Sequence, residues 1–415
     1  MFLTGFVQRE RLFDLATRWL ANRMEPEDTR FVTQAFIYEG LIVRPRVESF
    51  MTDLGSALHA PPLFRHRIFS KDDYRQAIME ACPHPSPAVA ELFARYRERP
   101  EEFYPHTPAD IYLAVDDKGH LMGTARMKRV RRLAEKASRR VADRLLANVE
   151  DRARELARSR AMASGQLRKG EQVAAEPRPE EYTEAERQVA ETFALREPVF
   201  SAADLRIDDV IGAKLIGPPE MQAAVEQAIR EQGHVNLVER EEHRGAYNAV
   251  NLLVDMDLPP AGEIIDRMRP LNWSFAAGRG IPTEELARDF PEYVESGARS
   301  IRVELILTTF EDLVESEFGG SIHEARILAQ RDGHYGRQIA RNASYILEFL
   351  LTLAVSPTLS VEEIPFKIWG RYLPVAVVQE MWKLYGLQYR DATWDSFLYD
   401  PGSNGFLLDP EKARV

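Results

Sequence analysis

The chain has 415 residues, of which 45% are hydrophobic and 9% aromatic, and its formal net charge is −11. This composition excludes a disordered chain, and the length exceeds one ordinary hydrophobic core, so we expect two or three packed units. Cys82 is the single cysteine, which excludes an intramolecular disulfide and a cysteine-based zinc site. The N-terminus lacks the apolar core of a signal peptide, and no apolar run approaches the roughly 20 residues of a membrane span. We therefore expect a cytoplasmic protein without membrane contact.

Basic residues are concentrated in one segment of this acidic chain. Residues 126–160 contain 13 Lys and Arg against 5 Asp and Glu, a local balance of +8, so the remainder carries −19. The total charge argues against a generic nucleic-acid coat, and this segment is a basic island in an acidic protein.

The first half of the chain is predicted to be mainly helical. Residues 1–105 carry apolar residues at helical spacing between proline-rich stretches, which predicts a helical N-terminal region. The spacing of apolar residues then changes from helical to strand-like in "DIYLAVDDKGHLMGTARMK". Two short apolar runs flank a turn sequence there and predict a β-hairpin. A long charged helix is expected to follow to about residue 165, then a polar link. Together they form a helical insertion at about 137–200.

Strand and helix patterns alternate from residue 205 to residue 310. The segments "RIDDVIGAKLIG", "HVNLVERE", "AYNAVNLLVDMD" and "SIRVELILTT" predict strands, with a helix after the first. With the hairpin they predict an α+β fold over 106–330, a mixed sheet of about five strands flanked by helices. Residues 331–415 return to helical spacing and end in a loop-like tail.

Carboxylates interrupt two of these apolar strands. Glu304 stands between apolar residues in "RVELILTT", and Asp209, with Asp208 beside it, stands in "RIDDVIG". An unpaired buried carboxylate is strongly unfavourable, so each requires a partner. Carboxylates on two sheet strands are suited to hold Mg²⁺ against the phosphates of a nucleotide. Ion pairs with nearby cations are the structural alternative, the candidates being Arg206, Lys214 and Arg302.

The start of the basic segment supplies a second part of such a site. Arg126 and Lys128 are expected at the junction between the hairpin and the long helix, pointing the same way. There they could neutralise a triphosphate, Arg through its bidentate fork and Lys as a point charge. Most of 139–160 is better explained as a solvated helix face.

The order of these motifs resembles the synthetase domain of the RelA/SpoT family of (p)ppGpp enzymes. The segments that carry the resemblance are "ARMKRVRRLAEKA", "DDVIGAKLI", "AYNAVNLLV", "VELILTT" and "EFGGSIHEA". The resemblance covers roughly residues 110–330. It implies a nucleotidyltransferase-like fold that transfers pyrophosphate from ATP, with Mg²⁺, to the 3′-hydroxyl of a nucleotide.

The resemblance also assigns roles to residues. Asp209 and Glu304 match the catalytic carboxylates that bind the metal, and Tyr247 matches the tyrosine that stacks on the acceptor base. The full set of nucleotide-binding positions is Arg126, Lys128, Lys136, Lys214, Tyr247, Asn251 and His323.

Departures from the family pattern gather at the acceptor site. Lys214 stands where the family has arginine, and Asn251 where it has histidine. The acceptor therefore stays open between a nucleotide, with guanine nucleotides among the candidates, and a tRNA 3′ end, which the basic segment favours. The alternative function is a catalytically inactive nucleotide-binding sensor or interaction module of the same fold. The sequence does not fix the oligomeric state.

Overall fold

The computed structural model describes residues 1–21, 23–58, 63–103, 105, 108–165, 176–195, 200–245, 248–277, 280–319, 338–354, 399–400 and 405–406. Two residues predicted to bind nucleotide, Tyr247 and His323, lie outside these ranges. Within the predicted C-terminal region, helix α12 (Gln338–Ala354) and a short pairing of β10 (Tyr399–Asp400) with β11 (Gly405–Phe406) are described.

Seven strands form one mixed sheet in the order β2–β3–β4–β6–β9–β8–β7. Strands β6 and β9 pair in parallel, and the other neighbours pair antiparallel. The bounds are Leu63–Ser70 (β2), Pro108–Val115 (β3), Leu121–Met127 (β4), Ile211–Ile216 (β6), Val235–His243 (β7), Ala249–Asp257 (β8) and Ser300–Thr308 (β9). The predicted α+β fold, with a mixed sheet flanked by helices, is confirmed.

The sheet is wider than the predicted number of about five strands: the hairpin and the four predicted strand segments supply six, and the N-terminal region adds β2. This strand lies within residues 1–105, which helical spacing alone assigned to helices, and it pairs with β3 at the edge of the sheet. Its sequence, "LFRHRIFS", places three basic residues between two apolar pairs, and charged residues are common on edge strands.

The two faces of the sheet pack against different helices. On one face, Val303, Leu305 and Leu307 are fully buried in the main core, as the strand alternation predicts. Helix α2 (Asp28–Ala57) covers this face together with α7 (Met221–Glu231). On the other face, Ile111 and Ile216 belong to a second apolar cluster with α3 (Lys71–Glu80), α4 (Pro87–Glu98) and α10 (Phe310–Phe318).

Three helices on the second face begin at side-chain caps. Ser70 and Ser86 accept hydrogen bonds from backbone N–H groups in the first turns of α3 and α4, and Thr309 caps α10 in the same way. Such caps satisfy N–H groups that have no partner within the helix. The second cluster covers one end of this face and leaves the end that holds Glu304 to another element.

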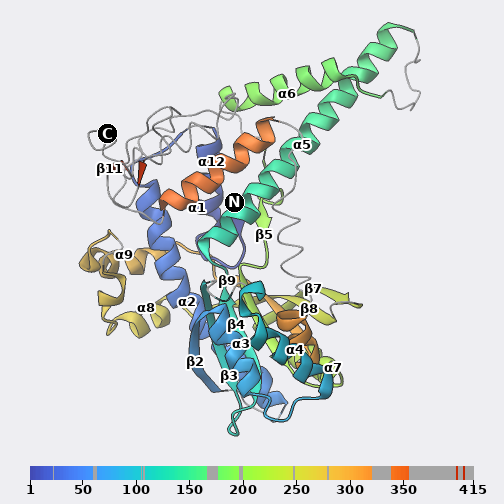
Figure 1. The fold of residues 1–415 in the computed structure, drawn as a ribbon. Helices are drawn as coiled ribbons and strands as arrows, with labels where there is room; N and C mark the ends of the chain where they lie inside the picture. Colours follow the sequence, from blue (N-terminus) through green and yellow to red (C-terminus); the bar gives the residue numbers. More distant parts are fainter. Residues whose placement is uncertain are drawn as a thin grey trace, which may run out of the picture.

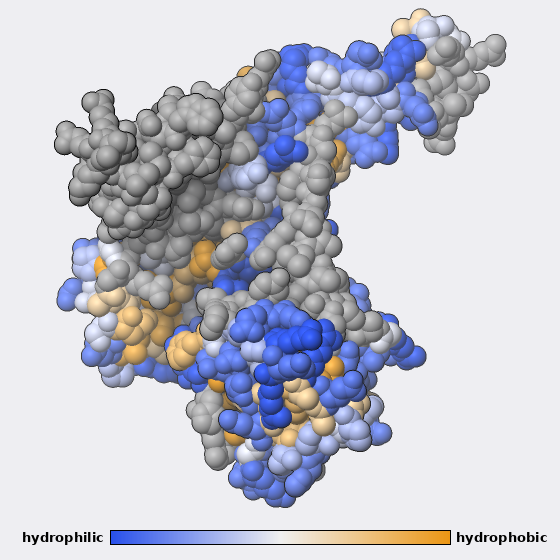
Figure 2. Space-filling view, viewed as in Figure 1, coloured by the Kyte–Doolittle hydropathy of each residue, from blue (hydrophilic) through white to orange (hydrophobic). Residues whose placement is uncertain are grey.

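That element is α5 (Val130–Ala163), which starts directly after β4. Its first half packs against α12, and its second half runs beside α6 (Pro179–Ala194), so that the pair projects from the body as an arm (Figure 1). The arm is largely hydrophilic on its visible side (Figure 2). The polar link predicted after residue 165 is therefore partly helical, because α6 occupies its second half.

The remaining elements complete the main core. They are β1 (Phe2–Leu3), α1 (Arg9–Leu20), β5 (Arg206–Ile207), α8 (Ala261–Met268), η2 (Trp273–Ala276) and α9 (Thr283–Glu295). The short helix η1 (Pro100–Phe103) instead packs Phe103 into the second cluster. Strand β1 pairs in parallel with β5, which brings the N-terminus beside the segment leading into β6. Within the described ranges, every helix is too short or too polar to cross a membrane.

Candidate functional site

Three residues form a row across the centre of the sheet on the face covered by α5. Arg126 on β4 pairs with Gly212 on β6, and Gly212 pairs with Glu304 on β9. A Cβ atom added at Gly212 would lie 3.8 Å from Nε of Arg126 and 3.9 Å from Oε2 of Glu304. The glycine therefore leaves room for about one carbon atom between a guanidinium and a carboxylate.

Asp208 and Asp209 lie in the bend between β5 and β6, beside this row. The sequence prediction placed Asp209 on a strand, and the structure corrects this, because the strand pattern is broken between Ile207 and Ile211. Asp208 pairs with Arg302 and with Arg206, each at 3.0 Å. The structural alternative thus holds for Asp208, whose ion pairs fix the bend.

Asp209 has different partners, both from the basic segment. Nζ of Lys128 lies 3.0 Å from Oδ2 of Asp209 and 4.0 Å from Oε2 of Glu304, so one ammonium lies between the two predicted catalytic carboxylates. Lys136, on the second turn of α5, also hydrogen-bonds the Asp209 carboxylate. The structure therefore brings Lys128, Lys136, Asp209 and Glu304 together.

The pKa values of this cluster follow from burial and neighbouring charge. Burial alone would raise the pKa of Asp209, but the ammonium charges of Lys128 and Lys136 outweigh it and hold that pKa well below its ordinary value. Burial lowers the pKa of Lys128 to about 8, against the opposing effect of Asp209. At neutral pH the side chains of this cluster are consequently charged, but Lys128 would lose its proton near pH 8.

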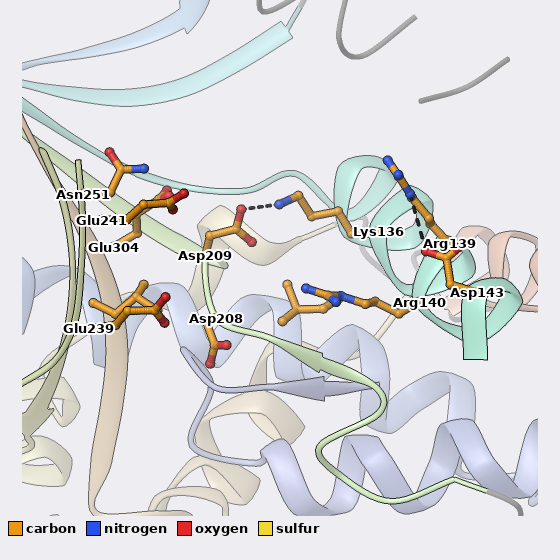
Figure 3. Close-up of a pocket in the computed structure, with 12 residues that line it drawn as sticks. Lys136, Arg139, Arg140, Asp143, Asp208, Asp209, Glu239, Glu241, Asn251 and Glu304 are labelled. Carbon is orange, nitrogen blue, oxygen red and sulfur yellow. Dashed lines mark hydrogen bonds and ion pairs between the residues drawn. The ribbon is translucent and has the colours of Figure 1, made fainter. Parts of the chain in front are cut away.

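Three of these side chains, Lys136, Asp209 and Glu304, line one cavity between the sheet and the start of α5 (Figure 3). Its volume is about 470 Å³. One wall is formed by α5, and the other by the bend at Asp209 and by strands β7, β8 and β9. Asp209 and Glu304 both line this cavity, which meets the geometric requirement that they lie on the same side of the sheet.

Two arginines of α5 line the cavity, contrary to the sequence prediction. Residues 139–160 were assigned to a solvated helix face, yet Arg139 and Arg140 line the cavity. They follow Lys136 by three and four positions, so the three side chains share one side of the helix. This spacing was the signal that could have separated them from the rest of the helix.

Lys214 lies on the same face, one alternation further along β6 than Gly212. Burial lowers its pKa to about 8, and the carboxylate of Glu317 opposes that shift. Arg126 and Glu304 also act on its charge. The charge of Lys214 thus interacts with the charges of Arg126 and Glu304.

Asn251 lies on β8 at the far wall of the cavity. Its Nδ2 lies 3.2 Å from Nε2 of His243, and its buried Oδ1 has no hydrogen-bond partner among the described residues. The roles predicted for Tyr247 and His323 remain predictions, because both lie outside the described ranges.

A second cavity, of about 800 Å³, lies on the other side of the Arg126–Lys128 segment. Most of its lining surface is apolar, with many residues from α2, and Arg126 and Lys128 are among the charged residues that line it. The basic segment therefore stands between an apolar cavity and the cavity that holds the carboxylates.

The donor chemistry of the first cavity fits a magnesium–nucleotide complex. No group of three or more His, Cys, Asp or Glu side chains in the described part of the chain is arranged to hold a metal ion unaided. Mg²⁺ commonly takes one or two protein carboxylates and completes its shell with water and phosphate oxygens. Asp209 and Glu304 could provide the protein ligands once Lys128 turns toward a phosphate.

Comparison with known proteins gives few relatives. No protein-family model matches the chain, and no curated protein matches it. Among solved structures, the small alarmone synthetase 1 from Bacillus subtilis is similar at 13% sequence identity. The match covers 51% of this chain and 94% of that chain, with a TM-score of 0.17. A likeness of this size carries no functional argument.

Several residues of the cavity were not anticipated from the sequence. Glu239 and Glu241, on β7, line the wall opposite α5. They stand in a charged run that looks like any solvated strand edge, and the sequence holds no signal that separates them. Gly212 did carry a signal, since a glycine inside a strand often marks a close approach by another group.

Proposed function

We propose that the protein binds ATP with Mg²⁺ and transfers its terminal pyrophosphate to the 3′-hydroxyl of an acceptor nucleotide or RNA end, breaking the bond between the bridging oxygen and the β-phosphorus and releasing AMP. The observation that carries the proposal is the row Arg126–Gly212–Glu304, with Lys128 and Asp209 in contact at its end. It combines carboxylates for a metal, cations for phosphates and a small space between them.

The two cavities suggest how the donor would lie. The apolar cavity is large enough for a nucleoside and has apolar walls of the kind that bind flat aromatic groups. Arg126 and Lys128, in its lining, would receive the triphosphate and lead it toward Asp209 and Glu304. The first cavity would then hold the acceptor.

In this arrangement the residues of the chain have separate tasks. Arg126, Lys128 and Lys136 would neutralise charge on the transferred group, and Glu304 would accept the proton of the attacking hydroxyl. Asp209 and Glu304 would hold the Mg²⁺ ion, which when bound polarises the phosphate oxygens. The fixed positions on three paired strands would align the donor and acceptor.

The test is binding and transfer in the same set of variants. Titration with ATP and Mg²⁺ should show binding that weakens at least ~10-fold in Arg126→Ala and in Asp209→Asn, because each loses a charged contact. Label from the terminal phosphates of ATP should move to one acceptor. Asp14→Asn is a matched control, since Asp14 is exposed in an ion pair with Arg18 on α1 and lines neither cavity. Binding unchanged in both site variants would remove the site assignment.

One observation favours the catalytically inactive alternative. The ammonium of Lys128 already occupies the space between Asp209 and Glu304, so the carboxylates have a partner without a metal. A sensor would use this internal ion pair as its ligand-free state. ATP binding without label transfer to any of GDP, GTP, AMP, ADP or tRNA would support the sensor.

A further inference from the structure

Arg140 is a cation of the first cavity that has no acidic partner. Lys136 is bound to Asp209, and Arg139 lies 3.6 Å from Asp143. Arg140 forms no ion pair or hydrogen bond with any described residue, although it lines the cavity. Figure 3 shows its side chain extending from α5 toward the bend that carries Asp208 and Asp209. Among the described residues that line the cavity, Arg140 therefore has a guanidinium group that is free to bind a ligand.

The wall opposite Arg140 is acidic. Glu239 and Glu241 lie on β7, in register with Leu253 and Asn251 of β8. Glu239 has no ion pair within the described ranges, and Glu241 lies 3.5 Å from His243. Counted together, the cavity lining contains three basic and six acidic side chains. A ligand with several negative charges would meet repulsion from this wall.

We infer that the acceptor is a nucleoside unit with a single phosphate group held by Arg140, and not a nucleoside diphosphate or triphosphate. The inference rests on the proposed function, in which the first cavity receives the acceptor. One guanidinium fork matches the oxygens of one phosphate group. A second or third phosphate would add charge beside Glu239 and Glu241 without gaining another free cation. A free nucleoside 5′-monophosphate and the last nucleotide of an RNA share this chemistry.

Binding measured without turnover tests the inference. Calorimetric titrations would use the full chain with Mg²⁺ and a non-hydrolysable ATP analogue. The ligands are the guanosine and cytidine mono-, di- and triphosphates and a four-nucleotide oligoribonucleotide with a free 3′-hydroxyl. GMP or CMP should bind at least ~10-fold more tightly than its own triphosphate. Tighter binding of the oligonucleotide than of either monophosphate would assign the phosphate to an RNA end.

Two sets of variants separate the cation from the acidic wall. Arg140→Gln should remove the preference for one phosphate, whereas the control Arg154→Gln, on the same helix and paired with Glu150, should retain it. The double change Glu239→Gln and Glu241→Gln should strengthen triphosphate binding at least ~10-fold, which a structural role would not explain.

The outcomes distinguish this inference from the proposed function. Triphosphates that bind as tightly as monophosphates, or an Arg140→Gln variant that weakens all ligands equally, would overturn it. So would failure of every monophosphate and of the oligonucleotide to bind. Selective binding without transfer of label from ATP would keep the Arg140 subsite and remove the transfer reaction.

Discussion

Lys128 contacts Asp209 twice: it donates a hydrogen bond to the backbone carbonyl, and its Nζ lies 3.0 Å from the carboxylate Oδ2. The two residues are 81 positions apart and come from the end of β4 and the bend before β6. The pairing of β4 with β6 brings them together. Lys128 therefore fixes the position of the aspartate as well as its charge.

Lys128→Met should expose the metal-binding capacity of the two carboxylates. Without the ammonium, Asp209 keeps Lys136, while Glu304 loses its cation. We expect the free energy of unfolding to fall by ~1–3 kcal/mol, because a partly buried ion pair is broken. Mg²⁺ alone should then raise the melting temperature of the variant more than that of the natural protein.

The matched control for that experiment is Lys71→Met. Lys71 forms a comparable partly buried ion pair with Glu317, at 2.8 Å, on α3 and α10. It should lose stability without gaining a response to Mg²⁺. Equal Mg²⁺ responses in both variants would show that Asp209 and Glu304 do not form a metal site.

ATP binding should weaken above pH ~8. Burial lowers the pKa of both Lys128 and Lys214 to about 8, against the ordinary value of 10.5, so both ammonium charges are lost as the pH rises through that value. Arginine stays charged over the whole range. In the double variant Lys128→Arg, Lys214→Arg, the dissociation constant should change less than ~3-fold between pH ~7 and pH ~9. A natural protein whose affinity is equally constant would argue against phosphate contacts from these lysines.

The predicted centre of the site follows from local patterns that tertiary structure does not override. Alternation in "RVELILTT" gives the face of Glu304 correctly, because one face of β9 is fully buried. The hairpin pattern gives the strand that carries Arg126. Both predictions depend only on how apolar and polar side chains are spaced along one strand.

Other parts of the structure depend on pairing and could not be predicted in that way. β2 is a strand because it pairs with β3, whereas its own composition is charged. The spacing from Lys136 places Arg139 and Arg140 on one side of α5, but only the sheet that lies opposite shows that this side lines a cavity. Asp208 and Asp209 have the same chemistry, yet Arg302 takes one and Lys128 the other. Which cation pairs with each aspartate is determined by contacts between segments that are distant in the sequence.

Gly212→Val should remove nucleotide binding while preserving the fold. An added Cβ would be in ordinary contact with Arg126 and Glu304, so alanine fits, and the two methyl groups of valine would fill the space between them. β-branched residues suit strands, so the free energy of unfolding should change by less than ~1 kcal/mol. ATP affinity should fall at least ~10-fold in Gly212→Val and less in Gly212→Ala. Natural affinity in the valine variant would show that this space holds no ligand.

Glu39 makes a pH-dependent contribution to stability, away from the site. Its fully buried carboxylate accepts hydrogen bonds from the backbone N–H groups of Val7 and Gln8 and from the hydroxyl of Tyr293. Burial nevertheless raises its pKa to about 7, although these hydrogen bonds oppose the shift. The unfolded chain has the ordinary value of 4.5, so the native state binds more protons between these two values.

The sign of the effect follows from that difference. The stabilisation is complete below the unfolded pKa and is lost as the pH rises through about 7. Relative to Glu39→Gln, the natural protein should lose up to ~3 kcal/mol of unfolding free energy between pH ~5 and pH ~8. Urea unfolding at both pH values measures this loss. Parallel pH profiles would mean that the hydrogen bonds from Val7, Gln8 and Tyr293 offset burial and keep Glu39 ionised throughout.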